Sequence, residues 1–534
     1  MPFNHEKLFD LFKTSLPKIF KRKGLSITLR KDLSRYIDKL QFIKHATGNL
    51  QSIMLTSVLR NSFSSELNNS AKLKSFPNLD ANISSKIIQE ANIPKKEPQN
   101  PLWSIGISKL HIISQIRHIL TSIEDAQTEL SFQGRIEALI SYIYRHPEAR
   151  ILSVKEGAIK ILLNARRKYK NKDQAALREA LSVLGYADPV PMKGIRILSI
   201  DGGGIRGLLV IEMLKKLEEL TGKRTYELFD LFCGTSTGAI LAFSMGIYHK
   251  SLDEIAQIYL DISNEVFKQS ALWGTGNLVW SQSYYSTPLW EKNLKKYLGD
   301  IRLMETARDP LCPKICTVSA VVNQSHLSAY LFRNYSLPQK IQSQYFGSFE
   351  HKVWEAVRAS AAAPTCFEEF KLGDFIHQDG GILVNNPTAI AIHEAKLLWP
   401  NQPIQCVVSF GTGRTVPTNF KQDNTTDTAS LNTSWKNKFF KILDSATDTE
   451  GVHTMLNDLL PDHIYYRFNP YLMEMVSMVE IEEKKIEQLK RDALMYLRRN
   501  EDKFHAAAKA LSESKNYMQR SSDWINCKRD MYGF

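Results

Sequence analysis

Residues 195–207 read Ile-Arg-Ile-Leu-Ser-Ile-Asp-Gly-Gly-Gly-Ile-Arg-Gly. The apolar run Ile195–Ile200 predicts a short buried strand, and the glycines after it predict a tight turn. The residues that follow, Leu208–Leu220, have the apolar spacing of a helix. Strand, glycine turn and helix therefore follow one another within about 25 residues, which is typical of one repeating unit of a parallel sheet.

The same order returns further along the chain. A strand is predicted at Leu228–Cys233 and a helix at Thr237–Ile247, again with glycines between them. Two more apolar runs predict buried strands at Ile315–Val322 and Cys406–Phe410. Strands that alternate with helices predict an α/β domain whose sheet is largely parallel.

The second glycine turn, Gly-Thr-Ser-Thr-Gly at residues 234–238, has the G-x-S-x-G pattern of a nucleophile elbow. In that motif the glycines permit a strained turn that presents a serine hydroxyl at the edge of the sheet. The predicted strand before it and helix after it are the context that the motif requires. Ser236 is therefore the candidate nucleophile, and the elbow around it consists of Gly234, Thr235, Thr237 and Gly238.

A third motif, Asp379-Gly380-Gly381, lies within the stretch Ile376–Pro387. The two glycines would free the loop that carries Asp379. Taken alone, an Asp before two glycines is most often a turn residue.

The first glycine turn has two functional interpretations. Its G-x-G-x-x-G pattern at Gly202–Gly207 fits a dinucleotide-binding turn, and its backbone N–H groups equally suit an oxyanion hole. The dinucleotide interpretation needs an acidic residue about 20 positions later, and Asp230 lies near that distance but inside a predicted strand. That interpretation also leaves Ser236 and Asp379 without a role. The hydrolase interpretation uses all three motifs and is favoured.

In this order the three motifs resemble the patatin-like phospholipase family. The resemblance implies a three-layer α/β/α hydrolase domain with a largely parallel sheet, preceded and followed by helical segments. It implies a Ser236–Asp379 dyad that hydrolyses fatty acyl esters of glycerophospholipids to lysophospholipid and free fatty acid. It further implies an Asp loop with Gly380 and Gly381, and an oxyanion hole built by Gly202, Gly203, Gly204, Arg206 and Gly207, in which Arg206 braces the loop.

The dyad raises a chemical question about the base. An ordinary Asp titrates near pH 3.9, so it is a weak base for a serine, whereas a His near 6.5 is better matched. A triad His would follow Asp379 in the chain, which leaves His393 and His453 as candidates. His393 falls within a predicted helix that begins near Pro387. The dyad therefore requires either a desolvated Asp379 with a raised pKa or proton transfer concerted with attack.

No cofactor or metal is expected. The sequence has no EF-hand loop and no His/Cys pattern with zinc spacing. Six cysteines in 534 residues do not form a disulfide framework, which favours a reducing compartment.

The charge is distributed unevenly along the chain. Residues 1–193 carry 31 Lys and Arg against 17 Asp and Glu, whereas residues 194–534 carry 38 against 39. An excess confined to the first third indicates a basic arm that faces an anionic partner. The three motifs that indicate a lipid hydrolase lie in the nearly neutral residues 194–534. The basic arm is therefore interpreted as a tether to an anionic membrane. A targeting segment and a merely solvated surface are the alternatives.

These observations predict five segments: a basic N-terminal segment at 1–60, a polar linker at 61–100, a helical region at 101–190, a catalytic domain at 195–415 and a mainly helical extension at 416–534. No apolar run is long enough to span a bilayer. The expected placement is intracellular and peripheral to a membrane, mitochondrial or endoplasmic reticular by resemblance. The last residues, Asp-Met-Tyr-Gly-Phe, are not a peroxisomal signal.

Two competing functions remain open. One is a soluble esterase or thioesterase with the same dyad, and the other is a non-catalytic lipid-binding protein on the same scaffold. No nucleic-acid reader motif is recognised, so no nucleic-acid partner is expected. The sequence does not indicate an oligomeric state.

Overall fold

The computed structural model describes residues 109–169, 173–268, 285–415, 449–474 and 476–532. The segments predicted as a basic N-terminal segment (1–60) and a polar linker (61–100) lie outside these residues.

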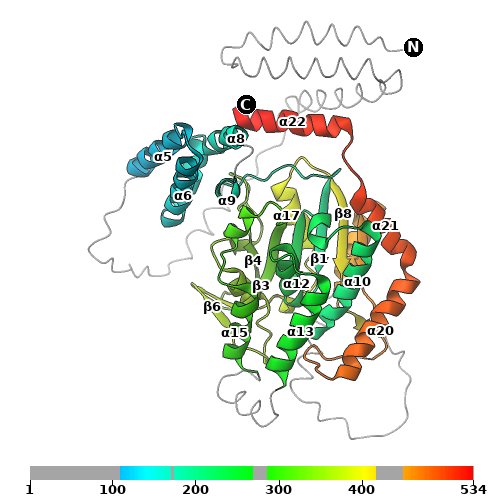
Figure 1. Cartoon of the computed structure of the whole chain (residues 1–534). Coiled ribbons are helices and arrows are strands. Elements are labelled where there is room, and N and C mark those ends of the chain that lie inside the picture. Colours follow the sequence, from blue (N-terminus) through cyan, green and yellow to red (C-terminus); the bar gives the residue numbers. More distant parts are fainter. Residues whose placement is uncertain (1–108, 170–172, 269–284, 416–448, 475, 533–534) are drawn as a thin grey trace, which may run out of the picture. The chain divides into compact units, whose positions relative to one another are not determined.

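In the described part of the chain, five helices precede the sheet (Figure 1): α5 (Lys109–Glu124), α6 (Glu129–Arg145), α7 (Glu148–Lys155), α8 (Ala158–Lys168) and α9 (Ala175–Val183). In α5 the buried side chains recur at helical spacing, at Ile112, Ile116, Leu120 and Ile123. Together these helices enclose an apolar core that also takes in Met531 of α22 (Tyr517–Tyr532).

The central sheet has the order β10-β8-β1-β2-β3-β4-β5. Strands β10, β8, β1, β2 and β3 run parallel to one another, and β4 runs antiparallel to β3. The strands are β1 (Ile195–Ile200), β2 (Leu231–Thr235), β3 (Lys314–Val321), β4 (Ser328–Arg333), β5 (Phe346–Ser348), β8 (Ile404–Phe410) and β10 (Tyr465–Phe468). The short hairpin of β6 (Phe370–Leu372) and β7 (Phe375–Asp379) joins the sheet through β3.

Helices cover both faces of the sheet (Figure 1). One face carries α10 (Gly207–Thr221), α12 (Thr237–Gly246) and α13 (Leu252–Phe267), and the other carries α17 (Thr388–Leu398). Strand β1 shows why helices are needed on both faces: its apolar side chains must be buried on each side of the sheet. Its Leu198 and Ile200 belong to the first core, whereas Ile195 and Ile197 belong to the second, because successive side chains point to opposite faces. The predicted α/β/α fold class is confirmed.

Shorter elements connect these layers. They are the 3₁₀ turns η1 (Gly204–Arg206), η2 (Met304–Arg308) and η3 (Gly380–Ile382), the helices α11 (Thr225–Leu228), α15 (Thr287–Leu298) and α16 (Val353–Ser360), and the two-stranded pair of β9 (Arg414–Thr415) and β11 (Tyr471–Leu472).

Two sequence predictions differ from the structure. The strand predicted at Leu228–Cys233 begins only at Leu231, because Thr225–Leu228 forms the helix α11. The boundary predicted at residue 415 does not separate two cores. Strand β10 extends the central sheet beside β8, and α19 (Thr449–Leu459) packs on α17.

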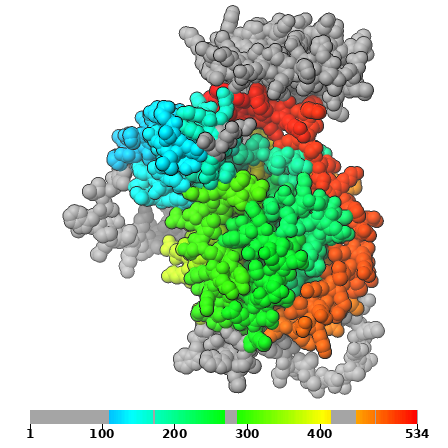
Figure 2. Space-filling view, viewed as in Figure 1, coloured from blue at the N-terminus to red at the C-terminus, as the bar shows by residue number. Residues whose placement is uncertain are grey.

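The last helices also belong to the core of the α/β domain. Helices α20 (Glu483–Arg499) and α21 (Glu501–Ser512) lie along α10, and Figure 2 shows their orange surface against the green surface of the α/β region. Phe468 of β10 is fully buried and stacks between Phe410 of β8 and Phe504 of α21, with ring centroids 5.5 and 4.1 Å away.

We expect Phe468→Ala to lower the free energy of unfolding by about 3–5 kcal/mol, because it removes a buried ring that three elements share. The matched control is Phe346→Ala, at a ring that is 73% exposed, which should change stability by less than about 0.5 kcal/mol. Denaturant unfolding of both variants measures the difference. Equal stability of the two would show that residues beyond 415 do not share the core of the sheet.

Candidate active site

Ser236 lies at the turn between β2 and α12, and its backbone has φ 54°. A positive φ is rare outside glycine and marks a strained turn. The turn needs glycine two residues later, since a Cβ on Gly238 would lie 2.2 Å from the carbonyl oxygen of Ile200 in β1. The Ser236 N–H donates to Ser360 Oγ at 2.9 Å, and Ser360 Oγ donates to the carbonyl of Val318 at 2.6 Å. The elbow is therefore held from β3 and α16.

The length of β3 brings Asp379 to this serine. Strand β3 pairs with β2 as far as Val318, opposite Thr235, and the next residue, Ser319, pairs with Asp379 of β7. Strand β7 thus meets the carboxyl end of β2 along the same side of β3. As a result Ser236 Oγ donates a hydrogen bond of 2.6 Å to Asp379 Oδ2.

The carboxylate of Asp379 is almost fully buried, with 7% of its surface exposed. Its Oδ1 accepts a hydrogen bond of 2.7 Å from the N–H of Gly381, the second glycine of the Asp loop, while Gly380 begins the turn η3. Burial raises the pKa of Asp379 to about 6, against the opposing effect of its hydrogen bonds with Ser236 and Gly381. The carboxyl group thus has the desolvated environment that a dyad base requires.

The glycine loop after β1 lies directly against the elbow. A Cβ on Gly202 would lie 3.2 Å from Ser236 Cβ and 2.5 Å from Asn385 Oδ1, so only glycine permits this approach. The Gly202 N–H, however, donates to Asn385 Oδ1 at 3.0 Å. Within the described residues the N–H groups of Gly203 and Gly204 have no hydrogen-bond acceptor. Two of the three predicted glycine donors are therefore available to a substrate oxygen.

The rest of the loop is fixed by backbone and side-chain contacts. The Gly202 carbonyl accepts from Thr412 Oγ1 at 2.7 Å, and the Arg206 N–H donates to the Gly203 carbonyl at 3.2 Å. Because a trans peptide places N–H and C=O on opposite sides, these two bonds direct the N–H groups of the next residues away from Thr412 and Arg206. The Arg206 side chain is 5% exposed, and Gly207 begins α10.

A hydroxyl chain connects the glycine loop to the elbow. Tyr259 Oη donates to Thr237 Oγ1 at 2.7 Å, and Thr237 Oγ1 donates to the Gly204 carbonyl at 2.8 Å. Thr237 is the first residue of α12, and its own N–H has no acceptor among the described residues. In nucleophile elbows the amide after the serine is an oxyanion donor, so this N–H adds a third donor to the two from the glycine loop.

A buried ion pair anchors the start of the loop. Arg467 of β10 binds Asp201 with both Nη atoms, at 2.9 and 2.6 Å, and both side chains are 2% exposed. The same guanidinium donates to Ser409 Oγ at 2.9 Å and approaches Glu450 Oε1 at 3.4 Å. Nothing in the sequence motifs indicated Arg467, because its partner precedes it by more than 260 residues.

A cavity of about 90 Å³ opens at Ser236 and Asp379. Its wall is largely apolar, which suits a hydrocarbon chain. The apolar side chains that line it include Ile205, Ile240, Ile262, Phe267, Trp290, Phe367 and Val479.

Neither candidate triad histidine reaches the dyad. His393 Nε2 accepts from the Gln344 N–H at 3.3 Å, and His453 Nδ1 lies 3.3 Å from Tyr465 Oη. Neither residue lines the cavity. The histidine nearest in sequence, His377 of β7, instead hydrogen-bonds Ser319 Oγ at 2.9 Å, and burial lowers its pKa to about 4.

The structure assigns Asp230 to a role other than ribose binding. Its carboxylate receives Arg196 Nη2 at 2.7 Å and Arg196 Nε at 3.1 Å, and both side chains are buried. The acidic residue that a dinucleotide-binding turn would need is therefore an ion-pair partner. Among the described residues no group of three or more His, Cys, Asp or Glu could hold a metal ion.

Two further residues of the site, Asn385 and Ser360, were not identified from the sequence. Asn385 stands in the same stretch as Asp379 and immobilises Gly202. Ser360 ends α16 just before an Ala-Ala-Ala-Pro run and holds the elbow N–H. Both act on backbone atoms, and such contacts leave no spacing pattern in a sequence.

The geometry agrees with the comparisons with known proteins. Residues 198–392 match the family model described as patatin-like phospholipase. Calcium-independent phospholipase A2-gamma of Oryctolagus cuniculus is 41% identical over 470 residues, which cover 85% of this chain and 59% of the relative. The protein of that name from Rattus norvegicus is 44% identical over 429 residues, covering 80% and 54%. The chain thus spans little more than half the length of these relatives.

A solved structure of human GIVD cytosolic phospholipase A2 is also similar, with a TM-score of 0.34, 9% identity, and coverage of 68% of this chain and 64% of that one. In the part of this chain that the structure describes, no helix is both long and apolar enough to cross a membrane.

Proposed function

We propose that this chain hydrolyses fatty acyl esters of membrane glycerophospholipids to lysophospholipid and free fatty acid, with Ser236 and Asp379 as its catalytic dyad. The observation that carries the proposal is the 2.6 Å hydrogen bond from a strained serine to a buried carboxylate at the mouth of an apolar cavity. The match to the patatin-like phospholipase family model and the names of the relatives support it. Those names also support independence from calcium.

In the first half-reaction Ser236 Oγ attacks the acyl carbonyl carbon while its proton passes to Asp379 Oδ2. The existing hydrogen bond sets the path of that proton. The raised pKa of Asp379 makes it a stronger base than an ordinary carboxylate. The protonated carboxyl then returns the proton to the departing lysophospholipid oxygen, which leaves an acyl ester on Ser236.

In the second half-reaction water attacks the acyl carbonyl carbon while its proton passes to Asp379. The bond from that carbon to Ser236 Oγ then breaks, Asp379 returns the proton to Ser236 Oγ, and the fatty acid leaves. The tetrahedral intermediate of each step carries a negative oxygen, which the N–H groups of Gly203, Gly204 and Thr237 are proposed to bind. The N–H of Gly202 is excluded from this role, because Asn385 already accepts it.

The basic first third of the chain is proposed as the tether to anionic lipid. Its Lys and Arg exceed its Asp and Glu by 31 to 17, whereas the remainder is nearly neutral. A basic residue near a negatively charged membrane contributes about 1 kcal/mol to binding. The proposed setting is a peripheral position on an intracellular membrane, mitochondrial or endoplasmic reticular, with no nucleic-acid partner.

We expect Ser236→Ala and Asp379→Asn each to lower the release of fatty acid from vesicles by about 10³-fold or more, because each removes one half of the dyad. Mass-spectrometric analysis of products from an asymmetric phosphatidylcholine measures the loss and the position cleaved. The controls are Asp374→Asn, at an exposed residue of the same hairpin, and His393→Ala, and both should retain activity. A loss with His393→Ala as large as with Ser236→Ala would contradict the dyad.

Two further outcomes separate the competing functions. Turnover of a short soluble ester without turnover of vesicles would identify a soluble esterase. Failure of a fluorophosphonate to label Ser236 would identify a non-catalytic lipid-binding protein.

The pH dependence of kcat/KM tests the base directly. Asp379 must be ionised to accept the proton, so kcat/KM on a soluble ester should be constant well above pH 6 and fall about tenfold per unit below it. The same fall in kcat/KM below pH 6 should be seen in His393→Ala and His453→Ala. A midpoint near pH 4, the ordinary range of a carboxyl group, would contradict a desolvated base.

We expect deletion of residues 1–100 to weaken binding to vesicles that contain anionic lipid and to reduce its salt dependence. Hydrolysis of a soluble ester should be unchanged, because the dyad and its supports lie after residue 195. Vesicle sedimentation at two salt concentrations measures this, with vesicles of neutral phosphatidylcholine as the control. Equal binding of both chains to anionic vesicles would leave the basic arm as a targeting or solvated segment.

A further inference from the structure

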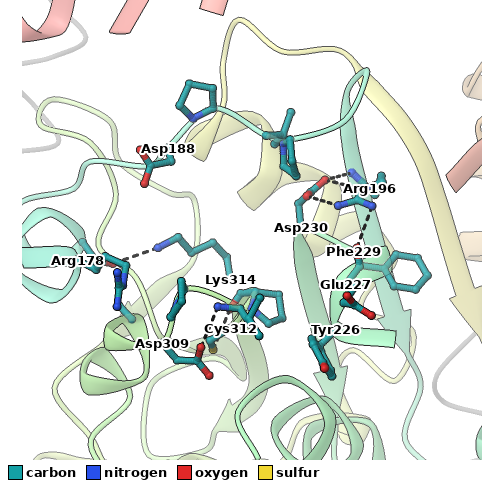
Figure 3. A pocket seen from close by; sticks show the side chains of 18 of the residues that line it. Arg178, Asp188, Arg196, Tyr226, Glu227, Phe229, Asp230, Asp309, Cys312 and Lys314 are labelled. Atoms are coloured by element: carbon teal, nitrogen blue, oxygen red, sulfur yellow. Dashed lines mark hydrogen bonds and ion pairs between the residues drawn. The ribbon is translucent and has the colours of Figure 1, made fainter. Parts of the chain in front are cut away.

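A second and larger cavity, of about 460 Å³, lies at the amino-terminal ends of the parallel strands (Figure 3). Arg196 near the start of β1, Asp230 just before β2 and Lys314 at the start of β3 all line it. Helix α9, the connector 186–192 and the segment 307–313 close its sides. We call it the amino-edge pocket. Its volume lies within the range of pockets that hold metabolite-sized ligands.

This pocket is separate from the dyad. Ser236 and the glycine loop follow the carboxyl ends of β2 and β1, whereas the amino-edge pocket lies at the opposite ends of the same strands. Six residues of β1 span about 20 Å between the two edges. No residue lines both cavities.

Within the described residues, three cations that line the pocket form no ion pair with an acid: Lys314, Arg178 and the exposed Lys223. In that part of the chain, Lys314 Nζ hydrogen-bonds only Ser182 Oγ, at 3.2 Å, and burial lowers the pKa of Lys314 against the opposing effect of the nearby Asp188 carboxylate. Arg178 uses Nε to bind the carbonyl of Arg308 at 2.8 Å, and its two Nη groups have no partner in the described chain. Figure 3 shows Arg178 and Lys314 on the same side of the pocket.

The acids of the pocket already have partners. Asp230 is paired with Arg196, and Asp188 receives Arg166 Nη1 at 2.8 Å from outside the pocket. Asp309 lies 3.4 Å from His249 Nε2 and accepts the N–H of Leu311. The fourth acid, Glu227, is exposed and accepts the N–H of Arg224. These contacts leave Lys314 and Arg178, together with the exposed Lys223, as the cations that an incoming anion would meet.

The remaining wall is apolar and aromatic. Leu181 and Phe229 are buried in the cores on either side, and the lining also includes Tyr226, Tyr186, Met192 and Trp399. A lysine supplies a point charge, and an arginine fork fits two oxygens of a phosphate group. The pocket therefore combines a phosphate-binding pair with a surface for an apolar or planar body.

We propose that the amino-edge pocket binds a soluble phosphate monoester with an aromatic or apolar body, with Lys314 and Arg178 holding the phosphate. The proposal does not depend on the chemistry at Ser236. Lipid phosphate is the other source of such an anion. A soluble ligand fits better, because the pocket lies at the edge of the sheet opposite the candidate site for lipid hydrolysis.

Isothermal titration calorimetry of the full chain with phenyl phosphate tests this. We expect one saturable site with a Kd below about 1 mM, and binding of inorganic phosphate and of phenol weaker by about tenfold or more. Lys314→Met and Arg178→Gln should each raise the Kd about tenfold, whereas Lys314→Arg should keep most of the affinity. The matched control, Lys396→Met at an exposed lysine of α17, should bind as the parent chain does.

Several outcomes would overturn the proposal. Titration without saturation would do so, as would an affinity for phenyl phosphate in Lys314→Met and Arg178→Gln equal to that of the parent chain. Loss of binding once Ser236 carries a fluorophosphonate label would also do so, because it would place the ligand at the dyad. Vesicles of phosphatidic acid provide the lipid arm. Binding to them that depends on Lys314, without binding of phenyl phosphate, would replace the soluble ligand by a lipid. Thermal unfolding shows whether each variant is folded. If Lys314→Met does not fold, the affinity of Arg178→Gln for phenyl phosphate decides whether the proposal holds.

Discussion

The ion pair between Asp201 and Arg467 is the constraint on which the candidate site depends. Both groups are almost fully buried, and removing one partner of such a pair typically costs about 3–5 kcal/mol, because the other charge is left alone in a low-dielectric interior. The pair joins the end of β1 to β10, two strands separated by β8. It therefore fixes the first residue of the glycine loop relative to the sheet. Through Glu450 it also connects that loop to α19, on the far side of residue 415.

A difference in strand length produces the second constraint. Strand β3 runs past the end of β2, and the vacant pairing positions of β3 are taken by β7 from the opposite direction. The chain ends of β2 and β7 consequently meet, and the serine of one faces the carboxylate of the other. A single residue of slip in either register would turn these side chains to opposite faces of the sheet. The backbone pairing of β3 thus determines the distance within the dyad.

Much of this arrangement was predictable from the sequence, and the remainder has a common physical cause. Strand Ile195–Ile200 and the three glycine motifs were recognisable, since apolar runs and glycine spacing are local patterns. Strand β10 was not recognised, because Tyr465–Phe468 is short and contains the charged Arg467, whose burial depends on a distant Asp201. Asn385 likewise acts on Gly202 across more than 180 residues. Contacts of this kind arise only when the sheet is assembled.

The backbone of Ser236 has a consequence for the stability of the domain. Holding a serine at φ 54° costs on the order of 1–3 kcal/mol that a glycine at the same position would not cost. Folding stability alone therefore favours replacement of this residue. Where a chain of this fold has no use for a hydroxyl at this turn, replacement of the serine by glycine should make the domain more stable.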